Sequence, residues 1–175
     1  MRFSESSKPH VSHIRELETL MFSSAGREYS VGNEPEGYLD YWQQHLARLY
    51  LVSVYIYINE VAGSEKFWNT SPAFSSHPEL VRCLEVMRLL RNKIVHSGGI
   101  AEPATSSNGQ KVRAFEADVA RADLKLQWQG NPVTVRPFFA IGTNGLISIH
   151  QNGLSMIRFL AVAALETEGV VNFVR

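Results

Sequence analysis

The segment RNKIVHSGG, residues 91–99, carries two residue types that can do chemistry together. The imidazole of His96 can give or take a proton near neutral pH. The guanidinium of Arg91 can form paired hydrogen bonds to the oxygens of a phosphate or a carboxylate. The pair therefore suits proton transfer beside a negatively charged group. Most of the remaining sequence is typical of a compact globular domain and indicates no chemistry of its own.

Arg91 stands where an apolar residue is expected. On a helical wheel with about 100° per residue and the first apolar residue at zero, Arg91 falls at about 20° and His96 at about 160°. The centre of the apolar face is formed by Leu80, Leu84, Met87 and Ile94. A buried arginine without a partner is destabilising by several kcal/mol, so Arg91 requires either an acidic side chain or an anionic ligand.

Two interpretations of this pair follow from the residues. In the first, Arg91 is structural and pairs with Glu60, which ends the apolar stripe of the preceding helix. His96 is then a helix-ending residue that interacts favourably with the helix dipole and the free carbonyl groups. In the second, the partner of Arg91 is an anionic ligand and His96 takes part in a reaction.

The elements that must position these residues are mainly helical. Apolar residues recur at helical spacing, and Gly, Pro, Ser and Asn mark the ends. Helices are predicted over residues 9–22, 38–62, 78–97 and 153–168. Within the second of them, residues 49–58 also have strand propensity, but no Gly or Pro interrupts the segment, and one long helix is favoured. Residues 23–37, 64–76 and 100–111 are predicted to be loops.

Two β-hairpins are predicted before the last helix. Alternation over residues 124–135 places one turn at Gly130-Asn131, and residues 138–150 place the other at Asn144-Gly145. Residues 112–123 are ambiguous. The prediction is one domain over residues 1–175, mainly α: an up-down four-helix bundle with a small antiparallel β insertion, about residues 112–150, before the last helix.

Composition excludes several classes of protein. The chain has 175 residues, 45% of them hydrophobic and 19% charged, with a formal net charge of zero. These values fit a folded globular protein without a strong overall attraction to nucleic acid or membranes. Cys83 is the only cysteine, which excludes an internal disulfide and a cysteine zinc site. We expect a cytoplasmic protein, because no signal-peptide core and no apolar run of membrane-spanning length is found.

The string Arg91-Asn92-x-x-x-His96 resembles the signature of the HEPN superfamily. That signature is an arginine, usually a polar residue after it, four to six residues, and then a histidine near the end of a helix. The resemblance covers residues 38–99 and the last helix but not the β insertion. It implies an α-helical bundle that acts as a homodimer, in which two motif helices line one cleft. Many members are metal-independent ribonucleases in toxin–antitoxin, phage-defence or RNA-processing systems.

The resemblance also implies roles for the residues of this segment. The ribose 2′-OH of RNA would be the nucleophile, His96 the proton shuttle, and Arg91 the group that neutralises charge on the phosphate. Asn92 would orient the imidazole or bind a phosphate oxygen, while Lys93 and Arg88 would attract the RNA backbone. No metal and no cofactor would be needed.

Our leading hypothesis is thus a metal-independent endoribonuclease with RNA as substrate and, in some systems, an antitoxin or other regulatory protein as partner. The alternative is a catalytically inactive helical dimerisation module that binds a protein or a nucleotide. In that alternative Arg91 is structural and Glu60 is its partner.

Overall fold

The computed structural model describes residues 41–150 and 153–170 of the chain. The helix predicted over residues 9–22 and the loop over residues 23–37 lie outside them. The α-helices described are α3 (Tyr41–Ala62), α4 (Pro78–His96), α5 (Ser107–Ala120) and α6 (Gly153–Thr167). Two 3-10 helices, η2 (Phe67–Asn69) and η3 (Pro72–Ser76), connect α3 to α4. The strands are β1 (Lys125–Trp128), β2 (Asn131–Thr134), β3 (Phe139–Ile141) and β4 (Ile147–Ile149).

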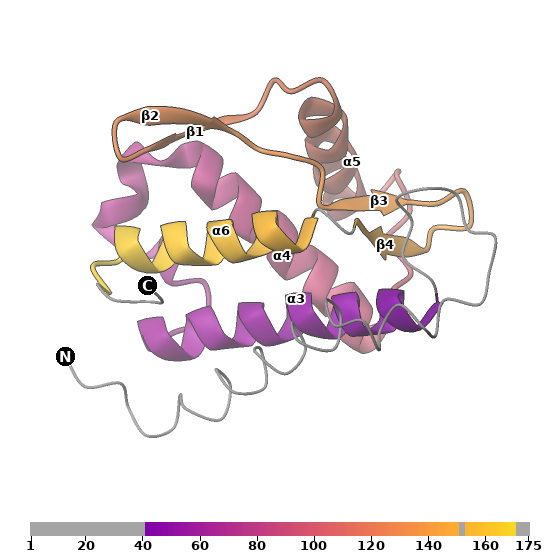
Figure 1. Cartoon of the computed structure of the whole chain (residues 1–175). Coiled ribbons are helices and arrows are strands. Elements are labelled where there is room, and N and C mark those ends of the chain that lie inside the picture. Colours follow the sequence, from indigo (N-terminus) through magenta and orange to yellow (C-terminus); the bar gives the residue numbers. More distant parts are fainter. Residues whose placement is uncertain (1–40, 151–152, 171–175) are drawn as a thin grey trace.

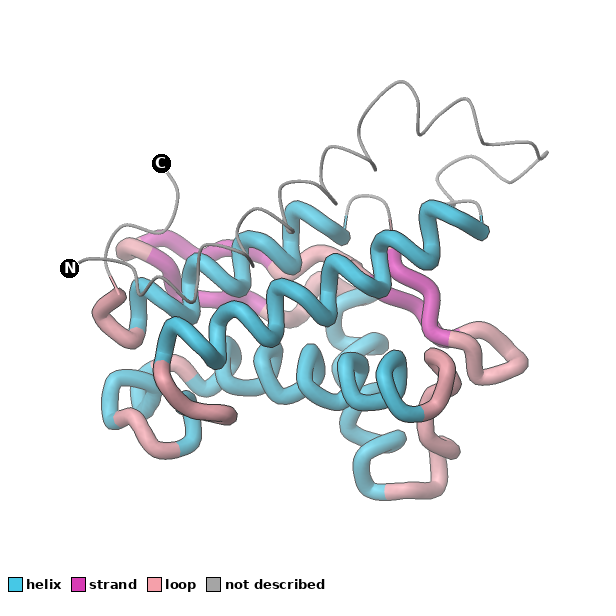
Figure 2. The backbone as a smooth tube through the Cα atoms, turned by 90° about the horizontal axis from the view of Figure 1, so that it is seen from below, coloured by secondary structure: helices cyan, strands magenta, loops and turns pink. Residues whose placement is uncertain are grey.

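Three of the helices form the centre of the molecule. α3 and α6 lie side by side and run in the same direction, while α4 packs on both and runs the opposite way (Figure 1). α5 packs against α4. The two β-hairpins lie at opposite ends of the helical layer (Figure 2). The fold is therefore mainly helical with two small antiparallel sheets, as the sequence predicts at this level.

The prediction of one long helix before Gly63 is confirmed. α3 continues through residues 49–58, which have strand propensity, because its side chains are buried on more than one side. Tyr50, Leu51 and Ile58 are each exposed by 1% or less. Burial on several sides stabilises the helix more than the weak preference of Val, Ile and Tyr for strands destabilises it. Among the described helices, none has the length and apolar character needed to cross a membrane.

The start and the end of α4 follow the predicted signals. Pro78 occupies the first turn of α4. Two glycines follow the end of the helix, and both have positive φ angles, 58° at Gly98 and 84° at Gly99. The N–H of Gly99 donates to the carbonyl of Lys93 at 3.0 Å, which closes the helix with a left-handed cap. A residue with a β-carbon is strained at such φ angles, so the glycines define where the helix ends.

The predicted extent of the β insertion is wrong. Residues 107–120 form α5, and the strands begin only at Lys125. Ser106 caps α5, because its Oγ accepts a hydrogen bond from the N–H of Gly109 at 3.0 Å. Val112, Phe115 and Val119 are buried at helical spacing. The polar, glycine-containing start of this segment resembles a turn, and that composition hid the helical pattern behind it.

The two hairpins are confirmed, with one shift. β1 pairs with β2 in antiparallel register, and its turn residues Gln129 and Gly130 have φ angles of 47° and 80°. The turn thus lies one residue earlier than predicted. β3 pairs with β4 around the predicted turn, where Gly145 has a φ angle of 79°. The segment over residues 64–76 was predicted to be a loop, but it forms η2 and η3.

The outer edge of β4 is bonded to α3 and to the end of α4. The side-chain amide of Gln44 donates to the carbonyl of Ile149 and accepts from its N–H, both at 2.9 Å. Arg48 donates from Nε and Nη2 to the carbonyl of Ile147, at 3.0 and 2.7 Å. The N–H of Ile147 donates to the carbonyl of Gly99 at 2.8 Å. These bonds fix the position of the C-terminal end of α4.

The close approach of α5 to the preceding loop gives a stability test. A β-carbon on Gly109 would lie 2.0 Å from the carbonyl oxygen of Pro103. We expect Gly109→Ala to lower the free energy of unfolding by about 1–3 kcal/mol, despite the higher helix propensity of alanine. Urea denaturation followed by circular dichroism measures this change. Gln110→Ala, on the exposed side of the same turn, is the control and should change stability by less than about 0.5 kcal/mol. Equal stabilities of the two variants would contradict the packing described here.

Candidate functional site

The two residues of the predicted catalytic pair lie on the same helix but on different sides of it. Arg91 is partly buried in the last turns of α4, and His96 is its exposed last residue. Five residues along an α-helix correspond to about 140° of rotation and about 7.5 Å of rise. The two side chains therefore leave one chain in different directions.

Among the residues that the structure describes, Arg91 contacts neutral groups. Its Nη1 donates a hydrogen bond to Oδ1 of Asn92 at 2.9 Å. Its Cζ lies 5.8 Å from the centre of the Tyr55 ring, which comes from α3. Its Nε is buried and has no hydrogen-bond partner in the described part of the chain. Within residues 41–150 and 153–170, no carboxylate forms an ion pair with Arg91.

Arg82, nine residues earlier on α4, provides an internal comparison. Its Cζ also lies over an aromatic ring, that of Phe115, at 5.6 Å. Unlike Arg91, Arg82 pairs with a carboxylate, because its Nη2 is 2.5 Å from Oδ2 of Asp118 on α5. The same helix thus holds one arginine in the way expected of a structural residue and one without an acidic partner in the described chain.

The structure does not join Glu60 to Arg91. Glu60 is exposed in the last turn of α3, and no ion pair links the two side chains. Asn92 is placed near Arg91 rather than His96, since its amide oxygen accepts the Arg91 hydrogen bond. Asn92 therefore orients the guanidinium in this structure.

The two further cations of the predicted site are already paired. Arg88 donates from Nε and Nη2 to the two carboxylate oxygens of Glu85, at 2.9 and 2.6 Å. Those hydrogen bonds hold the pKa of Glu85 below its usual value, although partial burial opposes the shift. Lys93 lies 3.1 Å from a carboxylate oxygen of Glu102. A phosphate group would have to compete with these carboxylates for either cation.

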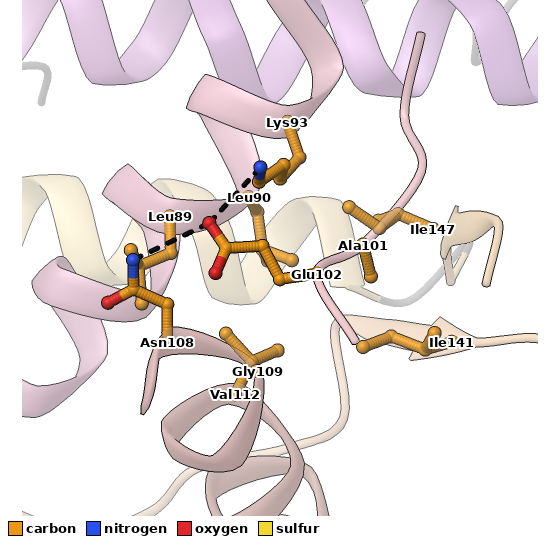
Figure 3. Close-up of a pocket in the computed structure, with 10 residues that line it drawn as sticks. All are labelled: Leu89, Leu90, Lys93, Ala101, Glu102, Asn108, Gly109, Val112, Ile141 and Ile147. Carbon is orange, nitrogen blue, oxygen red and sulfur yellow. Dashed lines mark hydrogen bonds and ion pairs between the residues drawn. The ribbon is translucent and has the colours of Figure 1, made fainter. Parts of the chain in front are cut away.

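Glu102 links α4 to the start of α5. Its carboxylate accepts a hydrogen bond from Oγ of Ser106 at 2.9 Å, in addition to the ion pair with Lys93. The Ser106 bond is the main reason that the pKa of Glu102 is lowered, and Lys93 adds to it. Figure 3 shows this carboxylate between Lys93 and Asn108, at the side of a pocket that is otherwise mostly apolar.

That pocket is too small for a nucleotide. Its cavity volume is about 20 Å³, which is room for about one water molecule. Besides the polar groups it is lined by the apolar residues Leu89, Leu90, Ala101, Val112, Ile141 and Ile147. A second cavity of about 30 Å³ lies between the start of α4 and β1. Neither of these two cavities, both formed by described residues, is lined by Arg91 or His96.

The described residues hold no group of three or more His, Cys, Asp and Glu side chains able to bind a metal ion. Cys83 is buried in α4, and burial raises the pKa of its thiol to about 12. A thiol with such a pKa is almost wholly protonated at neutral pH and is a poor nucleophile. Cys83 is therefore a packing residue.

Sequence reasoning missed Tyr55. This tyrosine is 1% exposed and is the aromatic residue whose ring faces Arg91. In the sequence it is one of several aromatic residues in the apolar run of α3. Helical spacing alone could not select it, because its contact with Arg91 depends on how α3 packs against α4.

No protein-family model, no curated protein and no solved structure matches this chain. The resemblance to the HEPN superfamily therefore rests on the spacing of Arg91, Asn92 and His96 and on the helix that carries them.

The pair formed by Glu85 and Arg88 predicts a pH dependence of stability. Because the pKa of Glu85 is lowered in the folded protein, its ion pair contributes stability above the pKa of the unfolded chain, near 4.3. That contribution is lost as the pH falls through the lower, folded pKa. We expect Glu85→Gln to lose less stability than the parent protein between about pH 7 and about pH 3, as measured by urea denaturation at several pH values. Glu65→Gln, the same type of change at an exposed residue, is the control. Parallel curves for the parent and Glu85→Gln would contradict this prediction.

Proposed function

We propose that the chain is a metal-independent endoribonuclease of HEPN type, in which Arg91 and His96 act on RNA. The observation that carries the proposal is the state of Arg91. A partly buried guanidinium that pairs with no carboxylate among the described residues keeps an uncompensated positive charge, which favours an anionic ligand. The phosphate of RNA is an anion with oxygens suited to paired arginine hydrogen bonds.

The proposal requires two copies of the chain. Because Arg91 and His96 leave α4 about 140° apart, one chain does not direct both side chains at the same phosphate. Two apolar side chains beside His96 are unusually open, Val95 at 47% exposed and Ile100 at 45%. Packing two α4 ends together would bury these side chains and bring His96 of one chain towards Arg91 of the other.

The proposed reaction needs no group outside the two chains and the RNA. One neutral His96 takes the proton from the ribose 2′-OH, and the 2′-oxygen attacks the adjacent phosphorus. The bond to the 5′-oxygen breaks, and the protonated His96 of the second copy donates its proton to that leaving oxygen. Arg91 neutralises charge that develops on the non-bridging oxygens. The products are a 2′,3′-cyclic phosphate and a 5′-hydroxyl.

The other residues have supporting roles in this proposal. Asn92 holds Nη1 of Arg91 and so orients the guanidinium. Lys93 and Arg88 contribute positive potential along the RNA backbone, reduced by their carboxylate partners. The up-down helical bundle, a cytoplasmic location and a regulatory partner of the antitoxin kind belong to the same proposal. A role in defence or RNA processing would fit it equally.

Cleavage of RNA by the purified protein in the presence of EDTA tests the proposal. We expect the parent to leave 2′,3′-cyclic phosphate ends, and Arg91→Ala and His96→Ala each to lower the rate by about 100-fold or more. Arg121→Ala, an exposed arginine on the far end of α5, and His77→Ala, at the opposite end of α4, are the controls. Both controls should cleave at close to the parent rate.

Two results would contradict the proposal. Cleavage that survives both Arg91→Ala and His96→Ala would mean that the motif is structural. A parent protein that forms dimers but cleaves none of a broad set of RNAs would favour the inactive dimerisation module. Size-exclusion chromatography with light scattering, run on every variant, separates loss of assembly from loss of chemistry.

A further inference from the structure

Arg91 lies at the end of a row of buried aromatic rings. The ring of Phe74 in η3 meets that of Phe67 in η2 edge to face, with 5.5 Å between the ring centres. Phe67 meets Trp68 at 5.2 Å, and Trp68 meets Tyr55 at 6.1 Å, again edge to face. These four side chains are each 3% exposed or less. The row fixes the Tyr55 ring in place beneath the guanidinium of Arg91.

An aromatic ring supports an arginine in a different way from a carboxylate. The face of the ring attracts the cation through its quadrupole but carries no net charge. A carboxylate would neutralise the guanidinium and would compete with any phosphate for its hydrogen bonds. A guanidinium held by an aromatic ring keeps its charge and its free N–H groups. On one helix, Arg82 has both an aromatic ring and the carboxylate of Asp118, whereas Arg91 has an aromatic ring and no carboxylate among the described residues.

The ring of Tyr55, rather than its hydroxyl, makes this contact. The hydroxyl is buried and makes no hydrogen bond of normal geometry within the described residues, although the Asn59 side chain is close enough to interact with it. The nearby amide of Asn59 donates to the Tyr55 backbone carbonyl at 2.9 Å, and its oxygen accepts from the N–H of Lys66 at 3.3 Å. A phenylalanine in place of Tyr55 would keep the face of the ring and remove only the hydroxyl.

We propose that Tyr55 is the positioning residue of Arg91: its ring holds the guanidinium in place and leaves the charge for a phosphate of the RNA. This inference rests on the proposed ribonuclease function. It adds a residue from α3, outside the motif, to the machinery on α4. It also assigns a role to the rings of Phe67, Trp68 and Phe74 in η2 and η3, because they keep the Tyr55 ring next to Arg91.

The test compares Tyr55→Leu, Tyr55→Phe and Tyr57→Leu in the full chain. Tyr57 is an equally buried tyrosine of α3, so its replacement matches the loss of a ring away from Arg91. We expect Tyr55→Leu to lower kcat/KM for RNA cleavage by about 2- to 30-fold relative to Tyr57→Leu, the range that cation–ring contacts provide. Tyr55→Phe should restore the parent value within about twofold. In an Arg91→Ala background, Tyr55→Leu should cause no further loss relative to Tyr57→Leu.

A second readout does not depend on activity. The Nε–H resonance of Arg91, assigned by its loss in Arg91→Lys, should be displaced upfield by the ring beneath it. The displacement should persist in Tyr55→Phe and Tyr57→Leu and disappear in Tyr55→Leu. If the Arg91 Nε–H resonance of the parent protein is not shifted upfield, the inference is overturned. This result comes from the parent protein and does not depend on whether the Tyr55 variants fold.

Failure of the positioning role of Tyr55 and failure of the ribonuclease proposal give different results. Equal losses of kcat/KM in Tyr55→Leu and Tyr57→Leu overturn the positioning role, because they indicate general loss of packing. Failure of the ribonuclease proposal appears differently: the parent cleaves no RNA, while the Arg91 resonance still responds to Tyr55→Leu. In that case the ring supports Arg91 for an anion other than RNA phosphate, and the part of the inference that names RNA is overturned.

Discussion

The hydrogen bonds along the outer edge of β4 are the constraint on which the rest of this structure depends. A strand of three residues is too short to be stable by itself, and its free edge would expose unpaired backbone groups. Gln44 acts as a substitute strand for Ile149, because its one amide group both donates and accepts there. Arg48 occupies the carbonyl of Ile147, whose N–H is bonded to Gly99. One strand thus holds the first turns of α3 and the residues just after α4. The β insertion is therefore part of the framework that positions His96.

The distribution of charge on α4 matters more than the net charge of the chain. A formal net charge of zero argues against a nucleic-acid partner when composition alone is considered. On α4, however, Arg82, Arg88 and Lys93 each pair with a carboxylate, whereas Arg91 pairs with none of those described. The neutralised cations contribute little field at a distance, so among the described arginines and lysines of α4 the uncompensated charge is that of Arg91. A neutral protein can hold an anion site of this kind because the attraction acts at contact distance.

Most of the described helices could be predicted from the sequence, but the contacts between them could not. α4 and α6 could be predicted because prolines and glycines mark their ends and because apolar residues repeat every three to four positions. α5 was missed because Ser107, Asn108 and Gly109 resemble a turn, although the pattern continues behind them. The position of Arg91 on a partly buried face was predictable from periodicity. Its contact with Tyr55 was not, and neither was the bond from Arg48 to Ile147, which joins residues 99 positions apart. Periodicity describes one element at a time, and such contacts depend on how elements pack.

The connection between α3 and α4 determines which residues of the two helices face each other. It spans residues 63–77, too long to fix the register of two antiparallel helices as a tight turn does. Instead, the connection buries Phe67, Trp68 and Phe74 against the helices. Because Trp68 contacts Tyr55 directly, the packing of these rings sets where Tyr55 stands along α4. A segment whose composition predicts a loop thereby fixes the distance between an aromatic ring on one helix and a guanidinium on the next.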